Sequence, residues 1–258
     1  MNLHEPGPFL LATDLDDTLL GDAEGESQLK AFMAGRHGRF RLAYVTGRRA
    51  SWVRELVKAG RLPAPDYVCA DVGTEIVAWD DPEDPIGRSY AARVAPTWDL
   101  EAIYALGAGD GVGRQDFSGG QTPFRACFSW DGRDKTLEAL RQRLSDRPGI
   151  RIVPSYGVSI DVLPAGLGKG EAVRFLQREL GLDPLQVVVA GDAGNDVEMF
   201  QTGFKGILPS NARDELRVFA RQPWHYHSPL PGARGVLDGL QHFGFTPPFP
   251  GEMSRFRR

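Results

Sequence analysis

Short apolar runs that end in polar residues recur along the chain, and this alternation constrains the fold more than any other feature of the sequence. The runs "PFLLATD", "FRLAYVTG", "PDYVCADVG" and "QVVVAGD" each have the length and apolar character of a buried strand. Amphipathic segments such as "RRASWVRELVKAG" and "KGEAVRFLQRELG" end in glycine, which is a common helix stop. Alternating strands and helices predict an α/β fold with a parallel sheet that is covered on both faces.

The middle of the chain has a different pattern. After the turn-rich segment "DDPED" come a helical segment, the run "PFRACFSW", a second helical segment, and the strand pair "GIRIVPS" and "VSIDVLP". A strand pair with helices of this kind predicts a smaller α/β module inserted into the larger one. We therefore assign residues 1–84 and 165–258 to a discontinuous core and residues 85–164 to the inserted module.

Length and composition limit the class of protein. A chain of 258 residues is long enough for a domain with an insertion. The formal net charge of -4 gives no reason to expect nucleic acid or an anionic membrane as a partner. No segment approaches the ~20 apolar residues of a membrane helix. With only two cysteines and no signal-peptide pattern, we expect a reducing, cytoplasmic location.

Carboxylates follow two of the predicted strands. Asp14 and Asp16 end the first run, and the alternation of side chains along a strand places them on the same side. Asp192 ends the late run, and Asp196 lies one helical turn later. Aspartates are common turn formers and helix caps, but two clusters directly after buried strands favour a cation site. Ligands that are all oxygen favour Mg²⁺ over zinc.

A hydroxyl and a lysine complete the candidate site. Thr46 and Gly47 follow a strand and precede a helix, where a hydroxyl and free backbone N–H groups suit a phosphate, although Thr46 alone would be an ordinary helix cap. Lys169 opens a helix, where a cation opposes the macrodipole, and alone it would be a surface lysine. Together with the carboxylates, this set fits phosphoryl transfer through an aspartyl phosphate.

The four clusters resemble a known set of motifs. "DLDDT", "TGR", the isolated Lys169 and "GDAGND" resemble, in this order, the four motifs of the haloacid dehalogenase-like phosphatases. "DLDDTLLGD", "RLAYVTGRR", "PDYVCADVGTEI", "VSIDVLP" and "GDAGNDVEMF" are similar to the sucrose-6-phosphate phosphatase branch, over roughly residues 9 to 245. The resemblance implies a Rossmann-like core and makes residues 85–164 a substrate-specificity cap, inserted between the second and third motifs.

The resemblance also implies a role for each motif residue. Asp14 would be the nucleophile, and Asp16 would act first as general acid and then as general base. Mg²⁺ would be bound by the side chains of Asp14 and Asp192 and by the backbone carbonyl of Asp16. The remaining implied roles are phosphate binding by Thr46, Gly47, Lys169 and Asn195, and support of the metal waters or of the lysine by Asp196.

The activity implied by the resemblance is Mg²⁺-dependent hydrolysis of a phosphorylated disaccharide, with sucrose 6-phosphate as the first expectation. The cap departs from the family pattern, because "RACFS" stands where the family tends to carry a Lys-x-Ser stretch, and "SYGVSID" carries Tyr156 and Val158. We assign Arg125 and Tyr156 as sugar contacts. The departure makes mannosylfructose phosphate a competing substrate, since a site that hydrogen-bonds sugar hydroxyls is sensitive to such changes.

Two other function classes fit part of the pattern. A sugar phosphomutase or phosphotransferase would carry the same Asp14 and Asp16 on the same scaffold. A receiver-like signalling domain or a sugar-phosphate sensor would also place Asp, Thr and Lys around Mg²⁺. Receivers are much shorter and need no cap, and a degenerate sensor would be expected to lose Asp16. We therefore expect a small-molecule sugar phosphate as partner, a monomer, and neither nucleic acid nor membrane.

Three residues near the motifs receive structural roles. Asp17 falls on the opposite side from its two neighbouring aspartates, and we predict that it is a turn residue. Gly73, in "ADVGTEI", is predicted to take a turn conformation beside the site. Asp71 is given no catalytic role.

Overall fold

Two separate sheets organise the chain in the computed structural model, which describes residues 8–34, 40–81, 83–94, 96–115, 123–155 and 158–245. The larger sheet has the order β11 (His225–His227), β10 (Lys205–Leu208), β9 (Val187–Ala190), β1 (Phe9–Thr13), β2 (Phe40–Val45), β3 (Tyr67–Ala70), β4 (Glu75–Ala78). All its neighbouring strands are parallel except the antiparallel pair β3 and β4. The predicted α/β class with a parallel-sheet core is confirmed.

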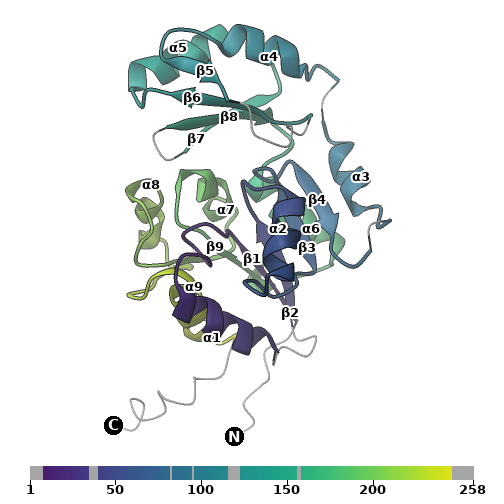
Figure 1. Cartoon of the computed structure of the whole chain (residues 1–258), viewed down its shortest axis with the longest axis vertical. Helices are drawn as coiled ribbons and strands as arrows, with labels where there is room; N and C mark the ends of the chain where they lie inside the picture. The colour runs from purple at the N-terminus through teal and green to yellow at the C-terminus, as the bar shows by residue number, and fades with distance from the viewer. Residues whose placement is uncertain are drawn as a thin grey trace, which may run out of the picture.

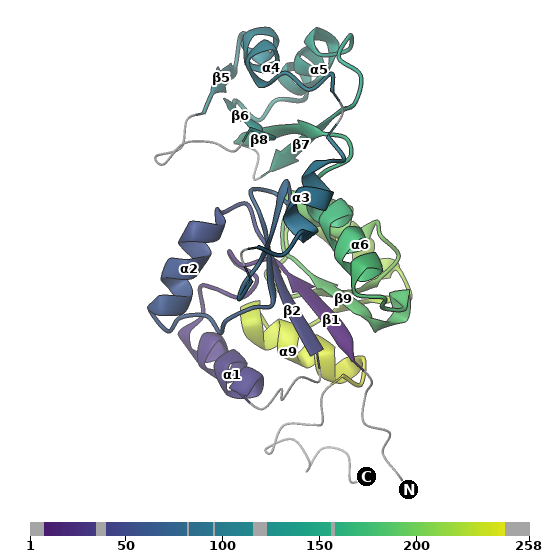
Figure 2. The same cartoon turned by 90° about the vertical axis from the view of Figure 1, so that its right-hand side faces the viewer.

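Helices cover both faces of the larger sheet, which explains why its central strands β1 and β9 read as nearly continuous apolar runs. All five residues of β1 are buried. Phe9 and Leu11 pack in one apolar cluster with α1, α2 and α9, while Leu10 and Ala12 pack in a second with α3, α6, α7 and α8. Figure 2 shows α1 and α2 on one side of the sheet and α6 on the other. The helices are α1 (Ala23–Ala34), α2 (Ala50–Lys58), α3 (Ile86–Ala91), α6 (Lys169–Glu179), α7 (Val197–Phe200), α8 (Asp214–Arg217) and α9 (Gly232–His242), with 3-10 turns η1 (Pro184–Gln186), η2 (Gly194–Asp196) and η3 (Val218–Arg221).

The smaller sheet is antiparallel throughout and has the order β5 (Val112–Arg114), β6 (Ala126–Trp130), β8 (Ser159–Pro164), β7 (Ile150–Ser155). Helices α4 (Leu100–Gly107) and α5 (Asp134–Arg143) cover one face with a separate apolar core that includes Ile103, Phe128 and Leu140. The predicted strand pair is confirmed, since β7 and β8 form a hairpin. Figure 1 shows the smaller sheet above the larger one, with its helices on the far side.

Helix α3 shows how the inserted segment begins. It lies inside the predicted cap, yet Ile86 and Tyr90 pack in the core of the larger sheet beside α6. The Tyr90 hydroxyl donates a hydrogen bond to the carbonyl of Gly73 (2.9 Å) and accepts one from the backbone N–H of Gly168 (3.2 Å). By packing, α3 is therefore part of the larger layer, and the division at residues 84 and 164 stays a prediction. Over the described ranges, none of the helices is both long and apolar enough to cross a membrane.

Candidate active site

The carboxyl ends of β1 and β9 bring three aspartates together. These strands pair in parallel, and the backbone N–H of Asp14 donates to the carbonyl of Ala190 across the pair (2.9 Å). Carboxylate oxygens of Asp14, Asp192 and Asp196 lie within 4.8 Å of one another, and all three residues are buried. Asp14 of the first acidic cluster therefore meets both aspartates of the second, as expected where parallel strands end at the same edge of a sheet.

Lys169 lies inside this acidic group. It is the first residue of α6 and is 0% exposed, so it is not a surface lysine. Its Nζ donates to Oδ1 of Asp14 and to Oδ1 of Asp196, both at 2.6 Å. Burial lowers the pKa of Lys169, but the charges of the two carboxylates outweigh burial and raise the pKa above its usual value. The lysine is therefore a permanent cation shared by two buried carboxylates.

Asp196 shapes the loop after β9. Its Oδ2 accepts hydrogen bonds from the backbone N–H groups of Asp192 (3.0 Å) and Ala193 (3.1 Å). A Cβ on Gly191 would lie 2.5 Å from Cγ of Asp196, so this close approach requires glycine. One oxygen of Asp196 thus fixes the loop that carries Asp192, while the other holds Lys169.

Two carboxylate oxygens in the group fit a hard divalent cation. Oδ2 of Asp14 and Oδ2 of Asp192 are buried and have no hydrogen-bond partner among the described residues, which is costly unless a ligand satisfies them. Oδ1 of Asp192 accepts a hydrogen bond from the Thr18 hydroxyl (3.0 Å), which orients the carboxylate. Burial raises the pKa of Asp14 well above its usual value, although Lys169 opposes the shift. Oxygen atoms of this kind are the ligands that Mg²⁺ takes.

Asp16 lies apart from the buried group, at the rim of the site. Its carboxylate is paired with the Arg48 guanidinium through Nε–Oδ2 (3.0 Å) and Nη2–Oδ1 (3.2 Å). Arg48 also lies over the Trp52 ring, 4.4 Å from its centre. Neither Arg48 nor Thr18 was singled out in the sequence, although both belong to the quoted motifs "TGR" and "DLDDT". Partial exposure leaves Asp16 able to meet a proton donor or acceptor from outside.

The residues predicted to bind phosphate surround the same edge. Thr46 is buried, and its Oγ1 accepts from the backbone N–H of Arg48 (3.1 Å). Thr46 is not a helix cap, because Arg49 takes that position for α2. A hydroxyl that accepts one hydrogen bond can still donate to a phosphate oxygen. Oδ1 of Asn195, on η2, is buried with no hydrogen-bond partner among the residues the structure describes.

The loop after β3 has an unusual backbone. Asp71, Val72 and Gly73 take left-handed φ angles of 51°, 61° and 74°. Glycine adopts this region freely, whereas a β-branched residue such as Val72 does so only under constraint. A Cβ on Gly73 would lie 2.5 Å from the carbonyl carbon of Gly168, so the loop packs directly against the start of α6. The turn predicted at Gly73 is confirmed, as is the turn at Asp17, which has a φ of 58°.

The two predicted sugar contacts have different outcomes. Tyr156 lies outside the described residues. Arg125 is only 8% exposed, and its guanidinium pairs with Asp161 at 2.8 Å and with Asp71 at 2.7 Å. The structure does not test sugar binding, so this role of Arg125 stays a prediction.

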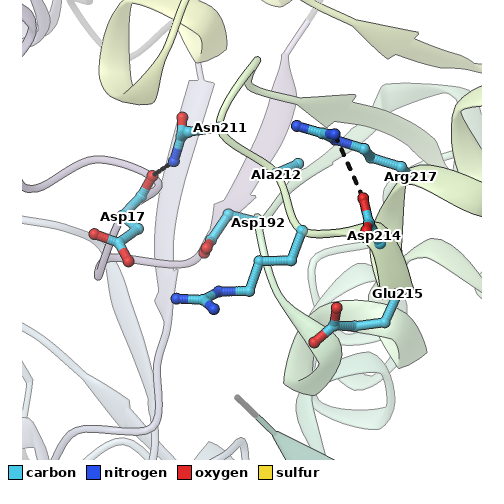
Figure 3. A pocket seen from close by; sticks show the side chains of 8 residues that line it. Asp17, Asp192, Asn211, Ala212, Asp214, Glu215 and Arg217 are labelled. Atoms are coloured by element: carbon cyan, nitrogen blue, oxygen red, sulfur yellow. Dashed lines mark hydrogen bonds and ion pairs between the residues drawn. The ribbon is translucent and has the colours of Figure 1, made fainter. Parts of the chain in front are cut away.

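One cavity opens at the acidic group, and a second lies between the two sheets. One, of about 580 Å³, has a polar wall that is shown in Figure 3, with Asp192 lying between Asp17 and the segment that carries Asp214 and Arg217. The other, of about 570 Å³, lies between the two sheets. Its wall includes Val153 and Leu163 from the smaller sheet and Val72 and Asn195 from loops at the larger sheet. The first cavity therefore leaves room for a ligand at Asp192, and the second leaves room for one between the sheets, next to Asn195.

A parallel sheet with carboxylates at its carboxyl edge, beneath a second α/β layer, is the arrangement of the haloacid dehalogenase-like phosphatases, the class to which this fold belongs. The sequence model of one family within that class matches nearly the whole chain. The chain belongs to the sucrose-6F-phosphate phosphohydrolase family, whose sequence model matches residues 7–244. The resemblance stated from the motifs is confirmed.

Individual relatives show how the family varies. The chain is 31% identical over 251 residues to the mannosylfructose-phosphate phosphatase of Agrobacterium fabrum, covering 92% of this chain and 98% of that protein. It is 32% identical over 250 residues, 92% of its length, to the glucosylglycerol-phosphate synthase of Pseudomonas anguilliseptica, but spans only 31% of that protein. It is 27% identical to the probable sucrose-phosphatase 2 of Arabidopsis thaliana, covering 95% of this chain and 62% of that protein.

A solved structure extends this similarity to three dimensions. The sucrose-phosphatase of Synechocystis sp. PCC6803, in complex with sucrose and phosphate, superposes with a TM-score of 0.83 at 30% identity. The alignment covers 94% of this chain and 100% of that one. The similarity therefore includes both sheets and not the parallel sheet alone.

Proposed function

We propose that the protein is a Mg²⁺-dependent phosphatase that hydrolyses a phosphorylated disaccharide, with sucrose 6-phosphate as the first candidate. The observation that carries the proposal is the buried Lys169, which is shared by Asp14 and Asp196 beside two unpartnered carboxylate oxygens. A phosphate dianion can approach a carboxylate nucleophile only where positive charge offsets the repulsion. Lys169 supplies part of that positive charge. The unpartnered carboxylate oxygens would bind the cation that supplies the rest.

The metal would be held by residues from both strand ends. Asp14 and Asp192 would bind Mg²⁺ through their side chains and Asp16 through its backbone carbonyl. When bound there, the ion adds positive charge next to the phosphate oxygens. Asp196 would act indirectly, because its carboxylate already holds Lys169 and the loop of Asp192.

The reaction would proceed in two displacements at phosphorus. Lys169 orients the Asp14 carboxylate through Oδ1, and the metal would take the unpartnered Oδ2, so Oδ1 is the oxygen that would attack phosphorus through its remaining lone pair. An Asp14 oxygen bonds to phosphorus as the bond to the sugar oxygen breaks, and Asp16 gives its proton to that leaving oxygen. Asp16 then takes a proton from water, which attacks the aspartyl phosphate and releases phosphate and free Asp14. In the structure Asp16 is an ion-paired carboxylate, so it would leave Arg48 and take up a proton from solvent before the first displacement.

The cavity between the two sheets is the proposed sugar site. A lining from both sheets would exclude water from the phosphate and contact the sugar at the same time. The near full-length similarity to a mannosylfructose-phosphate phosphatase favours mannosylfructose phosphate as the second candidate substrate. We propose a cytoplasmic location for the protein, with this small molecule as its partner.

A phosphate-release screen tests the substrate. The panel is sucrose 6-phosphate, mannosylfructose phosphate, trehalose 6-phosphate and hexose phosphates, each with Mg²⁺ and with a chelator. We expect kcat/KM for one disaccharide phosphate to exceed that for hexose phosphates by at least about tenfold, since sites that hydrogen-bond a substrate reject analogues that leave polar groups unpaired. A flat profile would contradict the disaccharide assignment. Transfer of phosphate to a second sugar, in place of release, would indicate a phosphotransferase.

Mg²⁺ binding is expected to release a proton near neutral pH. Burial and then the neighbouring charge of Asp196 raise the pKa of Asp192 to about 7. The metal-free protein therefore holds a proton that the ion must displace, and the apparent affinity should fall by about tenfold per pH unit below pH 7. Titration calorimetry in two buffers of different ionisation enthalpy measures this release.

The same pKa shift predicts how Mg²⁺ stabilises the fold. Between the unfolded value of 3.8 and the folded value of about 7, folded Asp192 binds more protons than the unfolded chain does. Its contribution to the stability of the metal-free protein is therefore present at low pH and is lost as pH rises through 7. The rise in Tm on adding Mg²⁺ should be larger at pH 8 than at pH 5. An equal rise at both pH values would contradict the assignment of Asp192 as a ligand.

A further inference from the structure

A buried arginine joins the smaller sheet to the loops around the site. Arg125 directly precedes β6, and its Nε donates to Oδ1 of Asp161 on β8 (2.8 Å). Its Nη1 donates across the interface to Oδ1 of Asp71 (2.7 Å) and to the carbonyl of Gly47 (3.0 Å). We propose that Arg125 and Asp71 form a latch that holds the smaller sheet closed over the site and positions the phosphate-binding loop.

The residues of the latch are buried. Arg125 is 8% exposed, Asp71 is 4% exposed and Asp161 is 2% exposed. Asp161 orients the guanidinium from within the smaller sheet, so the contacts with Asp71 and Gly47 are the ones that an opening movement would break. Closing removes both charges from water, and their direct hydrogen-bonded pairing offsets that cost, so a closed interface that lacked either charge would leave the other buried and uncompensated.

The core side of the latch is connected to both phosphate-binding segments. The backbone N–H of Asp71 donates to the carbonyl of Arg48, and that of Val72 donates to the carbonyl of Thr46, each at 2.9 Å. On the other side, the backbone N–H of Gly168 donates to the carbonyl of Gly73 (3.1 Å) at the start of the helix that carries Lys169. A contact made at Asp71 therefore constrains the Thr46 loop and the start of α6 together.

The backbone at the latch supports the same role. Left-handed conformations at Asp71 and Val72 cost free energy and persist only where the surrounding structure holds them. Arg125 binds the first of these residues directly, so closure of the smaller sheet helps to hold the strained loop in place. Arg125 is thus a positioning residue, which acts through Asp71 and Gly47.

This inference rests on the proposed phosphatase function, but the experiment has a readout that does not. The chain has two cysteines, and Cys127, on β6, contacts Arg125 directly, with its Sγ accepting from Nη2 at 3.8 Å. Both cysteines are 0% exposed, and Cys69 lies within β3 of the larger sheet. The rate at which a thiol reagent labels Cys127 therefore reports opening of the interface, while labelling of Cys69 reports unfolding of the larger sheet.

The test variant is Asp71→Asn, which keeps the size of the side chain, tolerates the left-handed backbone and removes the charge. We expect Cys127 labelling to speed up, and kcat/KM for the preferred sugar phosphate to fall, each by about ten- to a hundredfold, the range for losing a hydrogen bond between charged groups. Cys69 labelling should stay slow. The control is Arg141→Ala on α5, which removes an exposed arginine paired with Glu138 at 3.7 Å.

Other results would overturn the latch. Unchanged Cys127 labelling in Asp71→Asn would show that the pair does not hold the interface, and equal acceleration at Cys69 would show general destabilisation. Loss of turnover in Arg125→Ala with normal turnover in Asp71→Asn would make Arg125 a sugar contact. In a latch, Asp71→Asn and Arg125→Ala are coupled, so the double variant loses no more turnover than the worse single variant. If no sugar phosphate is a substrate, the proposed function is refuted. The rate of Cys127 labelling in Asp71→Asn still shows whether the pair of Arg125 and Asp71 holds the interface closed.

Discussion

Replacing Asp14 by asparagine is expected to abolish phosphate release while the fold stays intact. The amide cannot attack phosphorus as the carboxylate does, and loss of a nucleophile costs at least about 10⁴-fold in kcat. The fold should tolerate the change because burial already raises the pKa of Asp14 and so disfavours its charged form. Lys169 keeps its second carboxylate partner, Asp196, at 2.6 Å.

The measurement is phosphate release in the presence of Mg²⁺, with unfolding of both proteins followed by chemical denaturation. Asp80→Asn is the matched control, because Asp80 is exposed and follows β4, which runs antiparallel to β3 and so ends at the opposite edge of the sheet from the acidic group. The control should keep near-normal turnover. Undiminished turnover in Asp14→Asn would refute Asp14 as the nucleophile, and with it the aspartyl-phosphate route.

The fold could be predicted where a local pattern determines the packing. The run that became β1 is buried at every position and apolar at its first four because helices cover both faces of the sheet, and that requirement is visible in the sequence itself. Helix α3 shows the opposite case. Its buried residues Ile86 and Tyr90 are spaced for one helical face, but such spacing does not say which of two layers that face contacts. The domain boundary was predicted at residue 84 because the turn-rich segment ends there. That position lies before α3, which packs on the larger sheet.

The site could be predicted as far as strand ends determine it. Asp14 and Asp192 follow neighbouring strands, so their meeting follows from sheet topology. The burial of Lys169 could not be predicted from the sequence. A lysine at the first position of a helix can equally well be exposed to solvent, and only the positions of Asp14 and Asp196 in the fold show that it is buried. The ion pair of Arg125 with Asp71 joins residues 54 positions apart across two layers. Contacts of that kind depend on how the layers dock, which periodicity and motif spacing do not encode.

Lys169→Met is expected to lower the free energy of unfolding strongly. The replacement keeps the length and apolar stem of the side chain but leaves Asp14 and Asp196 buried without their cation. Removing one partner of a buried ion pair costs about 3–5 kcal/mol, so the free energy of unfolding should fall by that amount at pH 8 in a chelating buffer. Turnover should fall by at least about 10³-fold, because the charge that offsets the phosphate dianion is lost.

The pH dependence of this variant separates electrostatics from packing. Without the lysine, the buried carboxylates of the folded state hold protons more tightly than the unfolded chain does, so part of the lost stability should return as pH falls from 8 to 5. Adding Asp14→Asn to Lys169→Met should restore part of the lost free energy of unfolding at pH 8, because it removes one of the two buried negative charges. Denaturation curves at both pH values measure each effect. A methionine variant that is equally destabilised at pH 5 and pH 8, and unaffected by the second replacement, would show that Lys169 acts through packing and not through its charge.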